Sequence, residues 1–392
     1  MVEAPLKVAL YVHELVHTGV VRNTLLLASA LAAEGHRTEI ITALPGGMTP
    51  DGVEHRSLLR RPRTSRRLEH VLAVPLLRRH LGRSAPDVAV SMGNHGHPTF
   101  WAATRRMKVP RIYRISNDLQ RLARGAPRSN WLRQWVRVDF ARLLLADSFA
   151  MVLLAPNLLG HRLAETAQAS GKAVMIPNGI DIAKARLLAA CPSPHPWLEG
   201  DLPVILAVGR LASQKNFDAL LHAVAQLSGE QPVRLIILGE SRDNARVRLL
   251  AEAERLGIAD RLLLAGTTNN VFAWMRRADV VVQPSWWEGF SVVPLEAMAV
   301  GTPVVVSRTA GAAADLVSDT HGLLIDPRDA HGLAQAIARQ LDPETRVGPG
   351  NRAADYSLTR TVARWSKLIR TAAASRTNQQ QRPALLSAQQ GW

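Results

Sequence analysis

Short apolar runs and helical patterns alternate along most of the chain. Residues 7–12 form an apolar run, residues 23–34 carry leucine and alanine at helical spacing, and residues 38–42 form a second apolar run. The dipeptide Gly35-His36 separates the helical pattern from that second run. This order of strand, helix and strand is typical of units built on a parallel sheet, so the pattern predicts an α/β fold.

The same order restarts after a proline-rich stretch at residues 191–203. Beyond this stretch, residues 217–227 place their apolar side chains on one helical face. The runs that we expect to be strands are 204–208, 234–238, 279–283 and 302–307. We therefore predict an N-terminal domain over residues 1–185, a linker over 186–203 and a C-terminal domain over 204–355.

The end of the chain changes from a helical to a polar pattern. Residues 356–373 are expected to form a helix that returns to the N-terminal domain. Residues 374–392 include Gln379-Gln380-Gln381 and are poor in apolar side chains that could be buried. We expect this last segment to be a disordered tail.

Composition and charge narrow the class of function. There are 48 basic and 32 acidic residues, and residues 1–190 hold 27 of the basic and 13 of the acidic ones. Such an excess suits nucleic acid, a membrane surface or an acidic substrate. The single cysteine, Cys191, excludes an internal disulfide and a cysteine-based zinc site. No apolar run reaches about 18 residues and the start is acidic, so we expect no spanning helix, no export signal and a cytoplasmic location.

A first motif, at residues 207–216, joins an expected strand to an expected helix. Gly209 allows the backbone to turn, and Arg210 and Lys215 follow before the helix begins near Asn216. Amide groups at a helix start and two fixed cations form a site for an anion, best matched to a diphosphate. The alternative is an ordinary loop with solvated charges.

A second motif, at residues 284–303, carries two glutamates eight positions apart. Pro294 suits the first turn of a short helix that Gly301 ends, so Glu288 lies in the loop and Glu296 in the helix. Carboxylates in such an apolar segment need partners, and the hydroxyl groups of a sugar or ribose are suitable ones. A pair of structural salt bridges is the alternative.

A third segment, at residues 174–181, is a strand that enters an Asn178-Gly179 turn. In this order and spacing, the three segments resemble the retaining nucleotide-sugar glycosyltransferases of the GT-B fold, the fourth family of that enzyme class. The resemblance extends from Lys7 to about Ala373. It implies two Rossmann-like, doubly wound domains that face each other across a cleft, with the donor bound by the C-terminal domain and the acceptor by the N-terminal domain.

The resemblance also implies roles for individual residues. Arg210 and Lys215 would hold the donor diphosphate and stabilise the departing nucleoside diphosphate. Glu288 would lie beside the transferred sugar, and Glu296 would bind the ribose hydroxyls. The catalytic residues so implied are Glu288, Arg210 and Lys215. The other donor-binding residues so implied are Gly19, Gly209, Gly289, Phe290, Ser291 and Val292, with residues 266–271 beside the base.

The family needs no dedicated protein base, because a phosphate oxygen is usually proposed to deprotonate the acceptor. No metal is expected either, since the two cations stabilise the diphosphate and the sequence contains no Asp-x-Asp. We expect no cofactor, because the nucleoside-diphosphate sugar is a co-substrate.

The acceptor side departs from the family pattern. Many relatives carry a histidine after the fourth or fifth strand, where this chain has Ser116 or Asn117. His95 or His97 could line the same region, although a loop histidine is more often merely solvated. Of the usual double glycine in the first loop, only Gly19 remains.

Residues 13–17, His-Glu-Leu-Val-His, match the zinc-protease pattern His-Glu-x-x-His. That chemistry needs both histidines on one helical face and a third ligand. Here the match follows a strand directly and Thr18-Gly19 interrupts any helix. We therefore favour a role for His13 and His17 on the acceptor side.

The segment from Arg56 to Arg83 holds nine arginines and one acid around the apolar residues 71–77. This arrangement suits the surface of an anionic membrane. Trp131 and Trp135 form a second candidate, for which a core-packed helix is the favoured alternative. No nucleic-acid partner is expected, because no aromatic-interleaved basic motif or known nucleic-acid module is present.

The predicted function is a retaining hexosyltransferase. It would move a sugar from a nucleoside diphosphate to a glycan or lipid-linked acceptor of a cell-envelope or exopolysaccharide pathway, in the cytoplasm or at the inner face of the membrane. Two alternatives stay open. A sugar-nucleotide epimerase would convert free sugar nucleotide with no acceptor, and a catalytically weak binding protein would not consume it.

Overall fold

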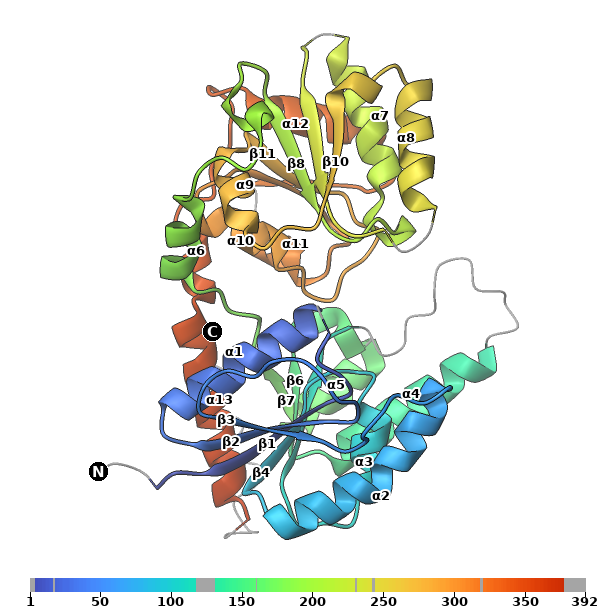
Figure 1. Ribbon diagram of the computed structural model, residues 1–392, viewed down its shortest axis with the longest axis vertical. Helices are drawn as coiled ribbons and strands as arrows, with labels where there is room; N and C mark the ends of the chain where they lie inside the picture. The colour runs from blue at the N-terminus through green and yellow to red at the C-terminus, as the bar shows by residue number, and fades with distance from the viewer. Residues whose placement is uncertain are drawn as a thin grey trace. The chain divides into compact units, whose positions relative to one another are not determined.

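The structure is a computed structural model (Figure 1). It describes residues 4–16, 18–117, 131–159, 161–229, 231–241, 244–317 and 320–376. The chain forms two compact units. The N-terminal unit comprises Met1–Pro177 and Thr361–Trp392, and the C-terminal unit comprises Asn178–Arg360.

The N-terminal unit is built on a seven-stranded parallel sheet of order β3-β2-β1-β4-β5-β6-β7. The order reverses between β1 and β4, which is the switch point beside which doubly wound folds bind ligands. The strands are β1 (Lys7–Val12), β2 (Arg37–Thr42), β3 (Val53–Ser57), β4 (Val88–Ser91), β5 (Arg111–Ile115), β6 (Ala150–Leu153) and β7 (Ala173–Met175). The helices are α1 (Gly19–Ala33), α2 (Arg66–Ser84), α3 (His97–Thr104), α4 (Trp131–Asp147) and α5 (His161–Ala169).

The last helix, α13 (Leu358–Ala374), completes the core of the N-terminal unit. Its buried side chains Trp365, Leu368, Ile369 and Ala372 belong to the same apolar cluster as those of β1 and β4. The Ser366 hydroxyl donates a hydrogen bond of 2.6 Å to the carboxylate of Glu34, the residue that follows α1. The end of the chain therefore folds with its beginning.

The C-terminal unit has a six-stranded parallel sheet of order β10-β9-β8-β11-β12-β13, with its switch point between β8 and β11. Its strands are β8 (Val204–Val208), β9 (Arg234–Leu238), β10 (Leu262–Gly266), β11 (Val280–Gln283), β12 (Val304–Ser307) and β13 (Leu323–Ile325). Its helices are α6 (Ile182–Ala189), α7 (Phe217–Ser228), α8 (Ala245–Arg255), α9 (Val271–Arg277), α10 (Val293–Ala299), α11 (Ala312–Leu316) and α12 (Ala330–Leu341).

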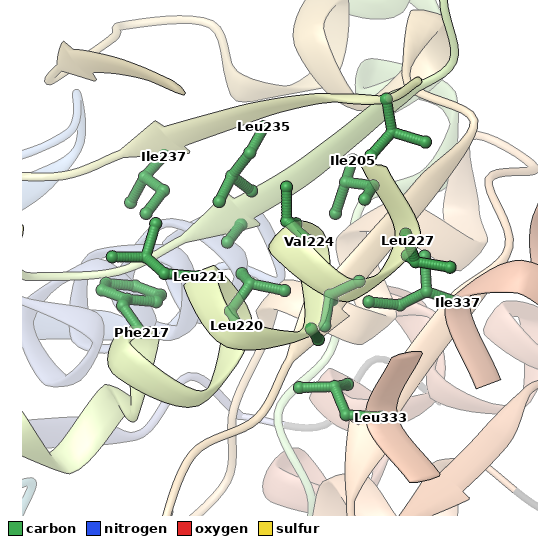
Figure 2. Packing of buried hydrophobic residues seen from close by; sticks show 14 of the residues in the cluster. Ile205, Phe217, Leu220, Leu221, Val224, Leu227, Leu235, Ile237, Leu333 and Ile337 are labelled. Carbon is green, nitrogen blue, oxygen red and sulfur yellow. The ribbon is translucent and has the colours of Figure 1, made fainter. Parts of the chain in front are cut away.

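The core of this unit shows why the apolar spacing predicted α7. Phe217, Leu220, Leu221, Val224 and Leu227 lie on one helical face and are all buried. Figure 2 shows this face between the aliphatic side chains of β8 and β9 and those of α12. Because the parallel strands are covered on both faces, they appear in the sequence as continuous apolar runs.

Two expected boundaries differ from the structure. The first domain ends at Pro177, and residues 186–203 are no linker, because they belong to the C-terminal unit. Asp181 caps α6 by accepting from the Lys184 amide, and residues 196–199 form a turn of 3₁₀ helix. Pro196 begins this turn, where its missing amide proton costs no hydrogen bond. The proline-rich stretch is therefore compatible with regular structure.

The first helix also starts earlier than expected, at Gly19 and not at residue 23. The Thr18 hydroxyl accepts from the Val21 amide and so caps the helix. The side chains of Trp131 and Trp135, and residues 377–392 of the expected tail, lie outside the described residues. Within the described residues, no helix is long and apolar enough to cross a membrane.

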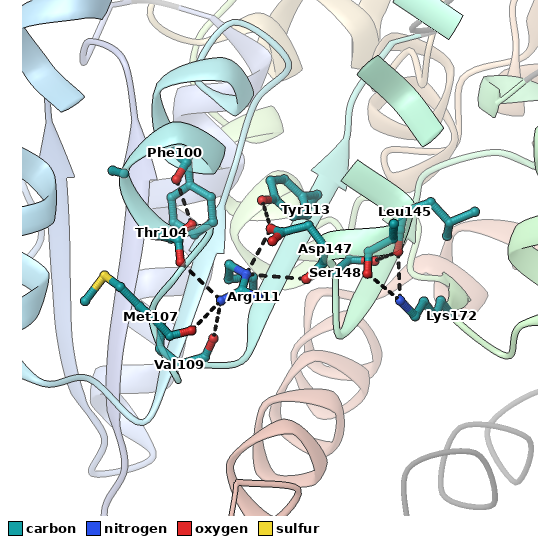
Figure 3. Close-up of polar contacts among 12 residues, drawn as sticks. Phe100, Thr104, Met107, Val109, Arg111, Tyr113, Leu145, Asp147, Ser148 and Lys172 are labelled. Atoms are coloured by element: carbon teal, nitrogen blue, oxygen red, sulfur yellow. Dashed lines mark hydrogen bonds and ion pairs between the residues drawn. The ribbon is translucent and has the colours of Figure 1, made fainter. Parts of the chain in front are cut away.

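Arg111 ties three elements together at the amino end of β5 (Figure 3). Its guanidinium donates to the carboxylate of Asp147 at 2.9 Å, and that carboxylate also accepts from the Tyr113 hydroxyl at 2.6 Å. It further donates to the carbonyl groups of Thr104, Met107 and Val109. These contacts lie at the opposite edge of the sheet from the carboxyl ends of the strands, so we assign them to folding.

Candidate functional site

Both donor-side motifs lie at the switch point of the C-terminal unit. Residues 209–216 follow β8, and residues 284–292 follow β11, the strand paired with β8. In doubly wound folds, the connections after such a pair of strands lead to opposite sides of the sheet, and ligands bind beside the carboxyl ends of these strands. The topology thus brings together two segments that are about 70 residues apart in the sequence.

Lys215 and Glu288 form an ion pair at this edge of the sheet. The Lys215 Nζ lies 2.8 Å from the Glu288 Oε1, and the two side chains are 15% and 13% exposed. Gln214 joins the same two segments by two further hydrogen bonds. Its side-chain Nε2 donates to the Trp287 carbonyl, and its main-chain carbonyl accepts from the Trp286 amide. The lysine and the glutamate are therefore held by three contacts between their loops.

Asn216 fixes the turn that leads into α7. Its φ is +56°, a left-handed conformation that asparagine tolerates. Its buried Nδ2 donates to the carbonyl of Pro284 at 3.2 Å and to that of Pro327 at 2.8 Å. The sequence predicted the helix start here but not this link, because both acceptors are distant in sequence.

Glycines bring the ends of β8, β9 and β10 together. The Gly209 amide donates to the Leu238 carbonyl, and the Gly239 amide donates to the Gly266 carbonyl at 2.7 Å. A Cβ at Gly239 would lie 2.6 Å from the carbonyl carbon of Gly209, too close for any side chain. Glycine at positions 209 and 239 therefore leaves room for the Lys215 side chain and for the neighbouring strand end.

The second motif has the expected local structure. Glu288 lies in the loop, whereas Glu296 lies in the first turn of α10 and is buried. Pro294 is in that first turn, and Gly301 follows the helix with a φ of +85°. The motif therefore places the Glu288 carboxylate in the loop beside Lys215 and the Glu296 carboxylate on the first turn of α10.

The segment from Gly289 to Val292 is held by a neighbouring loop. Phe290 forms a backbone bridge with Gly311, and the Ala312 amide donates to the Gly289 carbonyl at 3.3 Å. Gly311 has a φ of +62°, and a Cβ there would collide with the carbonyls of Glu288 and Gly289. Only glycine fits this position without displacing the segment.

Arg210 is exposed and forms no ion pair with any residue that the structure describes. The segment after β8 therefore carries two cations, Lys215, which is paired with Glu288, and Arg210, which has no ion-pair partner among the described residues. An incoming diphosphate would meet both, and it would compete with Glu288 for the lysine. Such an arrangement suits a strongly anionic ligand.

Gly19, the remaining donor-side residue, is the first residue of α1 in the N-terminal unit and is exposed. A Cβ there would have no neighbour within 4 Å. Packing within the unit therefore does not require glycine at this position.

The residues of the protease-like motif do not form a helix. His13 to Val16 are a loop between β1 and α1, and His17 lies outside the described residues. In the described part of the chain, no group of three or more histidine, cysteine or acidic side chains could hold a metal ion. Among the described residues of the motif, His13 to Val16, no helix places the side chains as the zinc-protease pattern requires.

His13 instead belongs to a buried cluster with two residues of α2. Its Nε2 lies 3.4 Å from the Glu69 Oε2, and its ring centre is 4.2 Å from that of His70. Burial lowers the pKa of His13, and the Arg63 amide, which donates to the carboxylate, lowers the pKa of Glu69. Burial also lowers the pKa of His70 to about 4. Periodicity could not reveal this cluster, because His13 is more than 50 positions from the other two residues.

The other two candidate histidines, His95 and His97, differ in burial. His95 is exposed, whereas His97 is fully buried with its Nδ1 2.7 Å from the Ser91 hydroxyl. Burial lowers the pKa of His97 to about 3, so it is a neutral core residue. The expectation that His97 lines an acceptor site is therefore wrong, since packing removes its ring from any ligand.

Ser116 and Asn117 lie at the carboxyl end of β5 and are linked by Asn94 to the loop that follows β4. The Asn94 Oδ1 accepts from the Ser116 amide and hydroxyl at 3.0 and 3.2 Å, and its Nδ2 donates to the Asn117 carbonyl at 2.7 Å. Asn117 is exposed and Ser116 is buried. Asn94 thus shapes the edge that we predicted to face the acceptor.

Family models match both units. Residues 18–179 match the model described as a glycosyl transferase 4-like domain, and residues 202–342 match that of glycosyl transferases group 1. A D-inositol 3-phosphate glycosyltransferase of Pseudarthrobacter chlorophenolicus is 40% identical over 157 residues, which cover 38% of this chain and 37% of that protein. The lipopolysaccharide core biosynthesis glycosyltransferase LpsE of Rhizobium meliloti is 36% identical over 137 residues, or 35% and 39% of the two chains. The chain thus spans about two fifths of the length of these relatives.

Solved structures match nearly the whole chain. Sucrose-phosphate synthase from Thermosynechococcus elongatus aligns with a TM-score of 0.76 and 21% identity over 94% of this chain and 99% of that one. The glycosyltransferase WaaG, involved in lipopolysaccharide biosynthesis, aligns with a TM-score of 0.69 and 19% identity over 95% and 100%. The chain therefore has the GT-B fold, and its two units are similar to the models of a glycosyl transferase 4-like domain and of glycosyl transferases group 1, in that order.

Proposed function

We propose that this protein transfers a hexose-type sugar from a nucleoside diphosphate to an acceptor with retention of anomeric configuration. The observation that carries the proposal is the Lys215–Glu288 pair, held between two loops at the switch point of the C-terminal unit. Two of the similar structures are of Anabaena HepE, one in complex with UDP and one with UDP-glucose. The names of the curated relatives also support transfer of a sugar.

In the proposed reaction, the bond between the anomeric carbon and the phosphate oxygen breaks as the acceptor oxygen bonds to the same carbon. The acceptor proton passes to an oxygen of the departing diphosphate on the same face, so the protein supplies no base. Negative charge develops on the diphosphate, and Arg210, Lys215 and the amides of residues 289–292 would stabilise it. No metal is needed in this scheme.

The two glutamates would orient the donor. When the diphosphate takes over part of the contact with Lys215, Glu288 becomes free to accept hydrogen bonds from the sugar hydroxyls. Glu296, fixed in the first turn of α10, would accept from the ribose hydroxyls. Binding energy would thus be used to position the anomeric carbon against the acceptor.

The acceptor would bind to the N-terminal unit. The named relatives act on D-inositol 3-phosphate and in lipopolysaccharide core biosynthesis, which supports an acceptor of a cell-envelope pathway. The arginines from Arg56 to Arg83 are exposed, which supports contact with an anionic membrane surface at its inner face. Sedimentation with neutral and anionic vesicles tests this part, and equal binding to both would contradict it.

The donor site is tested with Lys215→Ala and, as a matched control, the exposed Lys184→Ala of the same unit. A thermal-shift panel of UDP-, GDP-, ADP- and dTDP-sugars identifies the donor, and product detection on lipid-linked acceptors follows. We expect Lys215→Ala to lower kcat/KM by about 100-fold or more and Lys184→Ala to leave it unchanged. Near-normal transfer by Lys215→Ala would reject the donor site. Conversion of the sugar nucleotide to an isomer in the absence of acceptor would indicate an epimerase. Binding of the sugar nucleotide without its consumption would indicate a binding protein.

A further inference from the structure

We propose that the arginines between β3 and the first turn of α2 bind a phosphate group carried by the acceptor. The inference rests on the proposed function, whose acceptor it defines more closely. We call Arg60, Arg61, Arg63, Arg66 and Arg67 the loop arginines, and Arg78, Arg79 and Arg83 the helix-end arginines.

The fold separates these two groups. All strands of the N-terminal sheet are parallel, so the connection that leaves β3 starts at the carboxyl edge of the sheet. Helix α2 then returns toward the amino edge, where β4 begins at Val88. Its 19 residues span about 28 Å at 1.5 Å per residue. The loop arginines therefore lie at the ligand-binding edge, and the helix-end arginines lie at the other end of the helix.

Three contacts bring the loop arginines to the switch point between β1 and β4. His13, at the end of β1, pairs with Glu69 in the first turn of α2. The next residue, Glu14, forms an ion pair with Arg66. A Cβ at Gly47, in the loop after β2, would collide with the side chain of Leu15, so this loop packs there too. The start of α2 is thus fastened over the carboxyl end of β1.

The charge of the loop arginines is largely uncompensated. All five side chains are exposed, and within the described residues only Arg66 pairs with a carboxylate. Glu69, the acid next to them, is buried and already holds His13 and the Arg63 amide. Four guanidinium groups therefore face solvent at this edge, and guanidinium binds phosphate in a bidentate geometry.

Exposed apolar side chains adjoin the same place. Val16, Met48 and Leu68 are exposed, and each is one residue from a residue of the three contacts described above. Met48 is 91% exposed, which is unusual for a large apolar side chain in a folded loop. Arginines beside apolar groups fit the phosphate of an amphiphilic acceptor, whereas a soluble phosphate ester would use the arginines alone.

The test compares two double variants that remove the same charge. One is Arg61→Gln/Arg63→Gln in the loop group, and the other is Arg79→Gln/Arg83→Gln in the helix-end group. Both are made in a Lys215→Ala background, so that the donor-site lysine does not bind the probe. Calorimetric titration with dihexanoyl phosphatidic acid below its micellar concentration, and with inorganic phosphate, is done at one fixed salt concentration.

We expect the loop variant to weaken phosphate binding by at least tenfold and the helix-end variant to change it by less than twofold. Equal weakening in both variants would overturn the inference, since attraction would then depend on bulk charge. Unchanged binding in the loop variant would also overturn it. Tighter binding of the lipid than of inorganic phosphate identifies a lipid headgroup, and equal binding identifies a soluble phosphate ester.

Failure of the proposed function would give a different experimental result from failure of the phosphate-site inference. If the wild-type protein consumes no nucleotide sugar with any acceptor while loop-dependent phosphate binding persists, the glycosyltransferase proposal fails. The phosphate site then stands, but not its assignment to an acceptor. If transfer occurs and Arg61→Gln/Arg63→Gln, made without the Lys215→Ala change, transfers normally to a phosphorylated acceptor, only the inference fails.

Discussion

The two units hold the loops at their switch points by different kinds of contact. In the C-terminal unit, Gln214 and Asn216 bind main-chain carbonyls, and Gly239 lets two strand ends touch. In the N-terminal unit, the loop after β1 is fastened by the side-chain pairs of His13 with Glu69 and of Glu14 with Arg66. Apart from the Lys215–Glu288 ion pair, the contacts named in the C-terminal unit are neutral and insensitive to pH, whereas those named in the N-terminal unit depend on protonation and salt.

This difference suggests that the two units bind their ligands in different ways. A donor diphosphate is chemically constant, so a rigid backbone cradle suits it. Acceptors vary among glycosyltransferases with the same fold, and a surface made of charged side chains can change its ligand by substitution. The comparison predicts that glycine and amide changes damage the donor side, and that pH changes act through the N-terminal unit.

The largest effect is expected from Gly239→Ala. Because the new Cβ would collide with the Gly209 backbone, the ends of β8 and β9 must separate, and donor affinity should fall at least tenfold. Gly348→Ala, at an exposed glycine of the same unit with no neighbour within 4 Å, is the matched control. Donor titration monitored by thermal shift measures the effect. Equal donor affinities in the two variants would show that the glycine contact does not shape the site.

A smaller loss of stability is expected from Asn216→Ala. The change leaves two buried carbonyl groups without this donor and an alanine at positive φ, so the free energy of unfolding should fall by about 2–4 kcal/mol. Asn216→Gly removes the same hydrogen bonds but not the backbone conformation. Urea unfolding of both variants separates the two contributions, and identical stability of Asn216→Ala and wild type would contradict the proposed link.

Acid should weaken the N-terminal unit. His70 and His97 have pKa values lowered to about 4 and about 3, against 6.5 when unfolded. Between pH 6.5 and these values the unfolded chain binds protons that the folded chain does not. The free energy of unfolding should therefore fall as pH falls, by up to about 1.4 kcal/mol per pH unit for each histidine.

The histidine effect is measured by urea unfolding between pH 7 and pH 5. His97→Gln should reduce the slope against pH, and the exposed His331→Gln of the C-terminal unit is the control substitution. If both variants keep the wild-type slope, His97 does not cause the loss of stability in acid.

The smallest effect is expected from Glu69→Gln, which keeps the shape but removes the charge. Because the folded pKa of Glu69 is lowered, its contribution is present above the ordinary glutamate value and is lost as pH falls through the folded value. We expect a loss of about 1–2 kcal/mol at pH 7 that disappears in strong acid. Glu54→Gln, at an exposed position on β3, is the control. A difference that persists unchanged in acid would exclude the charge as its cause.

Sequence periodicity predicted strands such as β1, β2, β8, β9, β11 and β12 and the helix α7, because buried parallel strands are continuous apolar runs and α7 keeps its apolar side chains on one face. It also predicted the local structure of the two donor motifs, since Gly209, Pro294 and Gly301 act on their own neighbourhood. It misjudged residues 186–203, where prolines begin a turn of helix and do not separate domains. Prolines restrict the backbone in the same way in both settings, so composition could not distinguish them.

The amino-acid sequence by itself determined the α/β class, the alternation of strands and helices, and which loops carry Arg210, Lys215 and Glu288. Only the tertiary structure decided that Lys215 pairs with Glu288, that Glu69 pairs with His13 and that His97 is buried. The physical reason is strand order. Local patterns fix what each residue's neighbours along the chain do, but the order of strands in each sheet decides which distant loops meet at its carboxyl edge.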